Sequence, residues 1–227
     1  MRDAKGVEAV ERALKILDCF DPDAKEISLA ALSERTGFYK STILRLAISL
    51  ERFGLLVRGD NGQFRLGPGT WRLGSNYRNS FDMADLMRPE LRTLSQSTNE
   101  TASFYVRDGN SRVCLFRCEP LRAIRHAIAE GASLPLDRGA SGKVLLACSE
   151  DECEGKDAIT KAGYAVSIGE RDPEVAAIAV PVRSDRGRLI GALAVSGLVT
   201  RFTKQKRAEL LDALRESQRR LDSKMPD

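Results

Sequence analysis

The most constraining feature of this sequence is the segment 28–66, in which two helical patterns lead into a hairpin pattern. Ser28 is a favourable helix N-cap, and Gly37 readily takes the left-handed conformation that ends a helix, so a short helix is expected over 29–36. A longer helix is expected over 40–53. Two helices joined by so short a turn are typical of a helix-turn-helix.

The longer helix has a single apolar stripe at helical spacing, which predicts one buried face. The stripe consists of Ile43, Leu46, Ala47 and Leu50. After Gly54, two short strands over 55–58 and 63–66 enclose an Asn61-Gly62 pair, the strongest short-range signal for a hairpin. With a first helix over 7–20, this order predicts a winged helix-turn-helix, mainly α-helical with a β-hairpin wing.

The distribution of charge supports a surface that faces phosphate. The net charge of +4 is not decisive by itself, but residues 1–34 carry five basic against eight acidic groups, whereas residues 35–65 carry six basic against two acidic. A change to positive charge over one contiguous segment is typical of a nucleic-acid-binding face.

The N-terminal turn of the longer helix and the hairpin supply the candidate DNA-binding residues, because a recognition helix presents that turn to base edges and phosphates. They are Tyr39, Lys40, Ser41, Thr42 and Arg45 on the helix, and Arg58, Asn61, Gln63 and Arg65 on the wing. Arg45 can contact a guanine with two hydrogen bonds, and Lys40 can neutralise a phosphate. The alternative is a domain for protein contacts in which Lys40 and Arg45 lie on a solvated face.

A second domain is expected after Gly67-Pro68-Gly69, which is interpreted as a break in structure. The expected boundaries are 1–68 for the DNA-binding domain, 69–81 for a linker helix and 82–227 for an effector-binding and oligomerisation domain. Helices are expected over 82–97, 140–148 and 204–223, strands over 101–107, 111–117, 121–129, 164–168, 175–183 and 188–196, and a loop over 131–139. This order predicts an α+β domain with a mostly antiparallel sheet and helices on one side.

Composition argues against several classes of protein. A single histidine and no paired carboxylate motif argue against an enzyme, so no catalytic residue is expected. Five scattered cysteines lack metal-ligand spacing, so neither a metal nor another cofactor is expected. The Gly139–Lys143 segment does not match the phosphate-binding loop pattern. Without a signal sequence or a long apolar run, the expected location is cytoplasmic.

Several segments in both halves resemble the IclR family of bacterial transcriptional regulators. They are VERALKIL at 10–17, LAALSERTG at 29–37, KSTILRL at 40–46, LPLDRGASGK at 134–143, AVPV at 179–182 and GALAVSG at 191–197. The resemblance covers nearly the whole chain. It implies a winged helix-turn-helix, a linker helix and a GAF-like effector domain. It also implies homodimers, often paired into tetramers, that bind a palindromic operator in double-stranded DNA and repress or activate catabolic operons.

The resemblance also implies a pocket for a small organic acid or an aromatic metabolite. Its expected lining is Ala140, Ser141, Ser167, Val175, Ala177, Ala194 and Ser196. The amides at the start of the 140–148 helix, with Ser141, could hold a carboxylate. Residues 149–161 form a shorter bridge than is usual in the family. The alternative is therefore a regulator whose C-terminal domain only dimerises; a small-molecule-binding enzyme with a vestigial helix-turn-helix is a more distant one.

Overall fold

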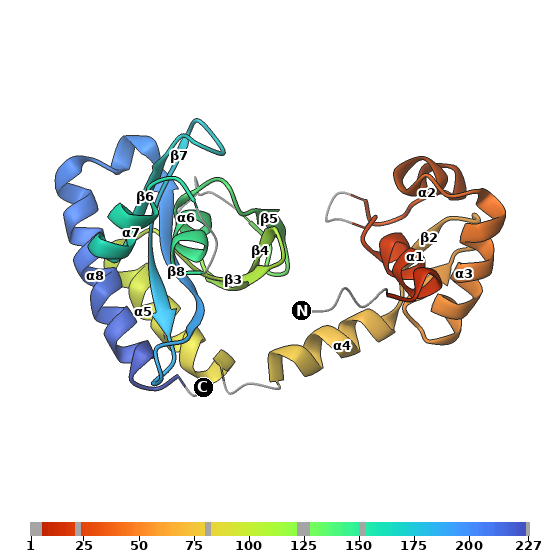
Figure 1. The fold of residues 1–227 in the computed structure, drawn as a ribbon, viewed down its shortest axis with the longest axis horizontal. Coiled ribbons are helices and arrows are strands. Elements are labelled where there is room, and N and C mark those ends of the chain that lie inside the picture. Colours follow the sequence, from red (N-terminus) through yellow and green to blue (C-terminus); the bar gives the residue numbers. More distant parts are fainter. Residues whose placement is uncertain (1–5, 21–23, 80–82, 122–127, 150–152, 226–227) are drawn as a thin grey trace. The chain divides into compact units, whose positions relative to one another are not determined.

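The computed structural model describes residues 6–20, 24–79, 83–121, 128–149 and 153–225, and it divides into two compact units, Met1–Phe81 and Asp82–Asp227 (Figure 1). Each unit has its own buried apolar core. Within the described residues, no helix is long and apolar enough to cross a membrane.

The N-terminal unit is the expected winged helix-turn-helix. Its elements are α1 (Glu8–Leu17), α2 (Leu29–Thr36), α3 (Lys40–Arg52), β1 (Leu56–Arg58), β2 (Phe64–Leu66) and α4 (Pro68–Asn79). Ser28 caps α2 by accepting a hydrogen bond from the Ala31 amide at 3.2 Å, and Gly37 ends it with φ +73°. The expected stripe on α3 is buried at Ile43, Ala47 and Leu50 and half-buried at Leu46.

The wing is an antiparallel pair in which Leu56 lies opposite Leu66. An isolated bridge from Ile27 to Phe64 adds a third segment of chain at its edge. The sequence Gly67-Pro68-Gly69 was expected to interrupt secondary structure, but α4 begins within it, at Pro68. Proline is suited to the first position of a helix, because the amide N–H at that position makes no hydrogen bond within the helix.

The C-terminal unit contains one six-stranded antiparallel sheet in the order β5-β4-β3-β8-β7-β6. Its strands are β3 (Thr101–Asp108), β4 (Ser111–Cys118), β5 (Ser133–Pro135), β6 (Ala165–Ile168), β7 (Val175–Arg183) and β8 (Leu189–Leu198). Its helices are α5 (Met83–Thr98), α6 (Ala140–Ala147), α7 (Lys156–Ala162), the short 3-10 turn η1 (Val199–Arg201) and α8 (Lys204–Asp222).

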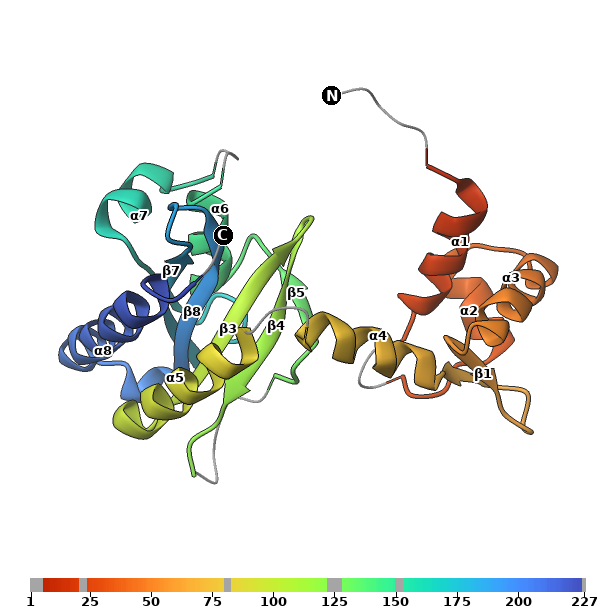
Figure 2. The same cartoon turned by 90° about the horizontal axis from the view of Figure 1, so that it is seen from below.

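Helices cover both faces of this sheet, so the expectation of helices on one side was wrong. α5 and α8 pack on one face and α6, with α7 against it, on the other (Figures 1 and 2). The cause is visible in β7, where Ile178 to Val182 are all buried, so that neither face of the strand is free for solvent.

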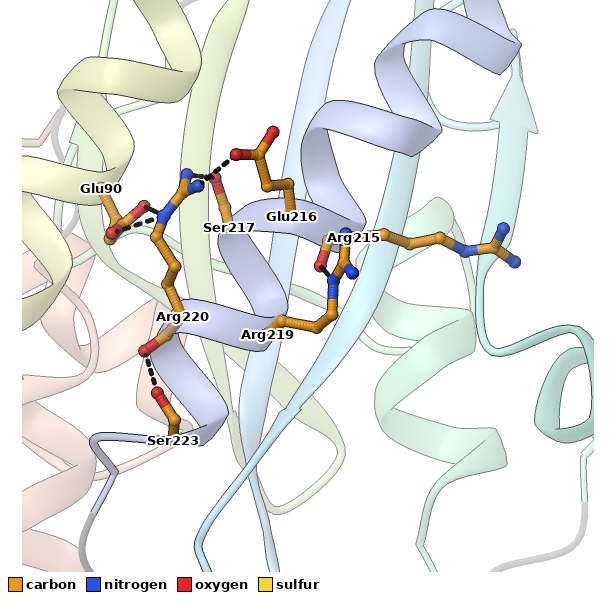
Figure 3. A network of polar contacts seen from close by, with 7 residues as sticks. All are labelled: Glu90, Arg215, Glu216, Ser217, Arg219, Arg220 and Ser223. Carbon is orange, nitrogen blue, oxygen red and sulfur yellow. Dashed lines mark hydrogen bonds and ion pairs between the residues drawn. The ribbon is translucent and has the colours of Figure 1, made fainter.

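Ion pairs and hydrogen bonds fasten α8 to its neighbours (Figure 3). The Arg220 guanidinium donates to both carboxylate oxygens of Glu90 on α5 at 3.0 Å and to Glu216 at 2.7 Å. On another side of α8, Arg215 donates to the Ala162 carbonyl at 3.2 Å and lies over the Tyr164 ring. Arg215 therefore holds the C-terminal end of α7.

Three expectations for connecting segments need correction or fall outside the described residues. The segment expected as a loop over 131–139 contains β5, which pairs with β4. The short bridge 149–161 contains α7, entered and left through left-handed glycines at Gly155 and Gly163. Of the strand expected over 121–129, residues 122–127 lie outside the described residues, and the flanking residues form no strand.

Candidate functional site

Side-chain hydrogen bonds hold the turn between α2 and α3. The Ser33 hydroxyl donates to the Phe38 carbonyl at 2.6 Å, and the Phe38 amide donates to the Thr36 hydroxyl at 3.2 Å. From α1, the Arg12 guanidinium lies 5.5 Å from the centre of the Phe38 ring. These contacts fix the direction in which α3 leaves the turn.

The first turn of α3 is open to solvent. Tyr39 is 84% exposed, and Lys40, Ser41 and Arg45 are also exposed, whereas Thr42 is half-buried against the domain. The structure thus brings the five helix candidates together, with Thr42 the least accessible of them. Arg45 projects from the side of α3 opposite the buried stripe.

The electrostatics of this helix start favour an anion. No side-chain cap is found at Tyr39, and the first turn of α3 has no acidic residue but carries Lys40. A cation at the positive end of a helix dipole is unfavourable unless a negative group lies nearby. The uncapped amides and the lysine together form a suitable seat for a phosphate.

The wing candidates differ in how free they are to bind. Arg58 and Arg65 are exposed, and the Arg58 guanidinium lies 5.5 Å from the Phe64 ring centre. Asn61 is engaged within the unit: its Oδ1 accepts from the Gln63 amide at 3.0 Å, and its Nδ2 donates to Glu26 at 3.2 Å. The side chain of Asn61 therefore shapes the turn, and contact with DNA would use the wing backbone or break the bond to Glu26.

In the C-terminal unit, all seven pocket candidates line one cavity of about 40 Å³ between α6 and the sheet. They are Ala140, Ser141, Ser167, Val175, Ala177, Ala194 and Ser196. Ala140 and Ser141 at the start of α6 and residues of β6, β7 and β8 supply this lining. The antiparallel pairing places Ala177 between Ser167 and Ser196. These seven side chains are small, and the cavity is partly open to solvent.

Sequence reasoning missed several further residues around the cavity, of which Arg112 is the most notable. The others are Tyr105, Ile128, Gly139, Arg171 and Asp172. Arg112 is only 3% exposed, and burial lowers the pKa of its guanidinium, with the nearby Arg171 charge acting in the same direction. The signal was present in the sequence: Arg112 alternates in phase with the buried Cys114 and Phe116 along β4.

A carboxylate fastens the loop after β6 to the start of α6. Glu170 accepts a hydrogen bond from the Gly139 amide at 3.2 Å and forms an ion pair with Lys143. Burial alone would raise the pKa of Glu170, but the bonds from Lys143 and Gly139 outweigh it and hold the pKa below its ordinary value. The next two residues, Arg171 and Asp172, then lie against the cavity.

The described residues offer no metal centre, since no group of three potential ligands is close enough together. Cys114 is a buried thiol: burial raises its pKa to about 11, which disfavours the reactive thiolate at neutral pH. The two candidate sites are therefore the open face of α3 and the cavity beside α6.

Comparison with known proteins matches both units to domains of one family. The profile for the IclR helix-turn-helix domain matches residues 9–60. The profile for the bacterial transcriptional regulator IclR C-terminal domain matches in two pieces, residues 75–157 and 154–223. The two pieces overlap at residues 154–157, within the segment 149–161.

Relatives of similar length share the whole architecture. The HTH-type transcriptional regulator XynR of Escherichia coli is 30% identical, over 93% of this chain and 94% of its own. A crystal structure of an IclR transcriptional regulator from a Silicibacter species is 27% identical with a TM-score of 0.82, covering 95% of each chain. A homologue from Microbacterium hydrocarbonoxydans complexed with 4-hydroxybenzoate is 21% identical with a TM-score of 0.78, over 95% of this chain and 98% of its own.

Proposed function

The chain belongs to the IclR family of transcriptional regulators, and from this we propose that it is a sequence-specific DNA-binding regulator of a catabolic operon, controlled by a small organic acid or aromatic metabolite. The proposal includes no catalytic step, and it places the protein in the cytoplasm, where its operator would be. The observation that carries it is the first turn of α3, which is uncapped, lacks acidic residues and exposes Tyr39, Lys40 and Ser41, with Arg45 exposed in the next turn.

The proposed division of labour follows from the position of each side chain. Lys40 and the amides at the start of α3 bind phosphate and set the register, whereas Arg45, one turn further along, reaches a base edge. Arg58 and Arg65 bind the DNA backbone from the wing. In solution such a pairing of contacts gives strong salt dependence together with sequence preference.

The test is footprinting and quantitative binding on the promoter next to the gene, with random DNA as competitor. We expect Arg45→Ala to weaken specific binding by about 1–3 kcal/mol and Lys40→Ala to weaken both kinds of binding while lowering the salt slope by about one. Lys204→Ala, an exposed lysine of the C-terminal unit, is the charge-matched control. Equal affinity of the wild-type protein for random DNA and for its best natural site would overturn the proposal.

A homodimer on a palindromic operator, with pairing into tetramers, is part of the proposal. An exposed apolar row in the N-terminal unit supports it: Val7, the N-cap of α1, and Val10 and Leu14 on that helix are 67%, 55% and 52% exposed. On α4, Leu73 is also 52% exposed. Exposed apolar rows of this kind are typical of association surfaces. Sedimentation of wild-type protein and of Val10→Lys tests this. The wild-type protein should sediment as a dimer or tetramer, and the substitution should weaken that association. Wild-type protein that sediments as a monomer would contradict the proposal.

Control by an effector is supported by the cavity beside α6 and by its polar lining. Because a ligand that binds only the folded state raises its melting temperature, a thermal-shift screen with organic acids tests this half of the proposal. Ligands that shift both the melting temperature and the DNA affinity support a sensor. A screen without any shift, with operator binding intact, would favour the alternative of a C-terminal domain that only dimerises.

A further inference from the structure

The exposed side of α3 carries an apolar side chain for which the proposed contacts of Lys40 and Arg45 give no role. Ile48 follows Arg45 by three residues and is 56% exposed. The apolar residues beside it on the helix, Leu44 and Leu46, are half-buried and pack against the core of the N-terminal unit. A single exposed isoleucine is common on protein surfaces, so the role of Ile48 has to be argued from its position.

Ile48 belongs to a continuous exposed strip along α3. Successive residues of an α-helix are turned by about 100°, so residues 41, 45, 48, 49 and 52 fall within an arc of about 100°. This arc lies opposite the buried stripe of the helix. The members of the strip, all exposed, are Ser41, Arg45, Ile48, Ser49 and Arg52. Ile48 is the apolar residue in a strip of serines and arginines.

The charge of this strip favours nucleic acid over a protein as its partner. Arg45 and Arg52 are positive, none of the five residues is acidic, and Lys40 lies just before the strip. Serine and arginine side chains donate hydrogen bonds to phosphates and base edges. A contact between two copies of the chain through this strip would bring the arginines of one copy close to those of the other, and such repulsion disfavours association.

The chemistry of the major groove then limits what an isoleucine can recognise. Thymine presents a 5-methyl group on its edge, whereas the remaining groups on the base edges are hydrogen-bond donors and acceptors. Isoleucine has neither, so against a polar edge it would exclude water without replacing the lost hydrogen bonds. Against thymine it covers a methyl group. Ile48 can therefore favour thymine both by an attractive contact and by a penalty at the other bases.

The spacing of Arg45 and Ile48 suits contacts to neighbouring base pairs. Three residues of α-helix rise by about 4.5 Å, and base pairs of duplex DNA are about 3.4 Å apart. The two side chains leave the helix within about 60° of each other, so both can face the floor of the groove. A helix with its side chains is about 10–12 Å wide and fits a major groove of about 12 Å.

We propose that Ile48 is a specificity-determining residue that contacts the 5-methyl group of a thymine in each half of the operator, within one or two base pairs of the base contacted by Arg45. This inference rests on the proposed function and adds a named chemical group to the sequence that the protein reads. Arg45 supplies directional hydrogen bonds, and Ile48 supplies an apolar contact. Loss of one buried methyl group corresponds to about a three- to fivefold loss of affinity.

The test is a fluorescence-anisotropy titration of the full-length protein with the operator duplex defined by footprinting, in which each thymine in turn is replaced by uracil. Uracil keeps every hydrogen-bonding group of thymine and lacks only the 5-methyl group. We expect one such replacement in a half-site to raise the Kd of the wild-type protein by about three- to fivefold. Ile48→Ala should bind the thymine operator more weakly than wild type, and the same replacement should then change its Kd by less than about 1.5-fold.

Two further variants serve as controls. Ile168→Ala removes an isoleucine of the C-terminal unit that is 46% exposed, and it should keep the full effect of uracil. Ile48→Val retains a branched apolar side chain and should keep most of the effect. Alanine and valine are both accepted at exposed helix positions, and alanine favours the helix more than isoleucine does, so both variants at position 48 should fold.

The outcomes separate this inference from the proposed function. If uracil has the same effect at every thymine in wild type and in Ile48→Ala, Ile48 does not read a methyl group, and the inference fails while sequence-specific regulation stands. A smaller assembly of Ile48→Ala in sedimentation, with an unchanged response to uracil, would assign Ile48 to a contact between copies and would also overturn it. Equal affinity of wild-type protein for its operator and for random DNA would overturn the proposed function itself.

Discussion

Replacing Gly142 with alanine would put a methyl group where α6 meets the loop before it. The new Cβ would lie 2.3 Å from the Leu136 carbonyl oxygen and 2.8 Å from Nη1 of Arg112. Carbon and oxygen approach each other to about 3.3 Å in favourable contacts, so α6 must move by roughly 1 Å. The movement would disturb the preceding loop, where the carbonyls of Pro135 and Arg138 accept hydrogen bonds from Arg112.

The magnitude follows from two opposing effects. Overpacking of this kind costs about 1–3 kcal/mol, whereas alanine in a helix is favoured over glycine by about 0.5–1 kcal/mol. The two ranges leave a net loss of up to about 2.5 kcal/mol, and of about 1 kcal/mol at their midpoints. For a unit of this size each kcal/mol lowers the melting temperature by about 2–4 °C.

The control is the same substitution at Gly74 on α4, where a Cβ meets no atom within 4 Å. There alanine should stabilise the helix by about 0.5–1 kcal/mol. Calorimetry of the full chain separates the two units, and Trp71 on α4 provides a fluorescence signal for the N-terminal one. If Gly142→Ala raised the melting temperature of the C-terminal unit as Gly74→Ala raises that of its own unit, the steric reasoning would be refuted.

Three further substitutions test other contacts. Ser33→Ala removes the bond to the Phe38 carbonyl and should cost about 1–2 kcal/mol in the N-terminal unit, with weaker operator binding in a mobility-shift assay. Glu170→Gln should destabilise the C-terminal unit at pH 7; because the pKa of Glu170 is depressed, the difference from wild type should shrink as the pH falls below its ordinary value of 4.5 in urea titrations. Arg201 donates hydrogen bonds to both carboxylate oxygens of Glu100, which is 2% exposed. Arg201→Met leaves this buried carboxylate without its charged partner and should lower the free energy of unfolding by up to about 3–5 kcal/mol, as measured by chemical denaturation.

Each of these has a contrary outcome. Unchanged operator affinity in Ser33→Ala would show that its hydrogen bond does not orient α3. If the difference in unfolding free energy between wild type and Glu170→Gln grew as the pH fell, the protonated carboxyl group of Glu170 would be the form that stabilises the fold. Glu100→Gln, which leaves Arg201 with some access to water, should cost less than Arg201→Met; the reverse order would contradict the burial argument.

The helix-turn-helix could be predicted closely from sequence because its signals are local. Ser28, Gly37 and Gly54 mark helix ends by their own conformational preferences, and the apolar stripe of α3 follows its period. The apolar row on α1 was less informative: Ile16 is buried, but Val10 and its neighbours along that side are exposed. Periodicity identifies an apolar face without saying what covers it.

The C-terminal unit was harder because tertiary contacts decide its details. α7 is too short to be stable by itself and depends on Arg215 holding its end, a contact 53 residues away in sequence. The positions lining the cavity came from the family resemblance, whereas Arg112 lies on a strand that the resemblance did not mark. Arg112 is a charged residue at a position that alternates with buried residues along β4, and this pattern indicates a polar group inside the domain.

The two-sided packing of the sheet has a mechanical consequence for β8. Ala194 and Ser196 point into the cavity, while the alternating residues Leu193 and Val195 belong to the core shared with α5 and α8. Close-packed interiors have little compressibility, so a ligand that displaces β8 must also displace what lies behind it. α8 packs against both β8 and α5, and α5 is the first helix after α4 in the chain. A ligand that displaced β8 would therefore act through α8 on the helix nearest in sequence to the DNA-binding unit.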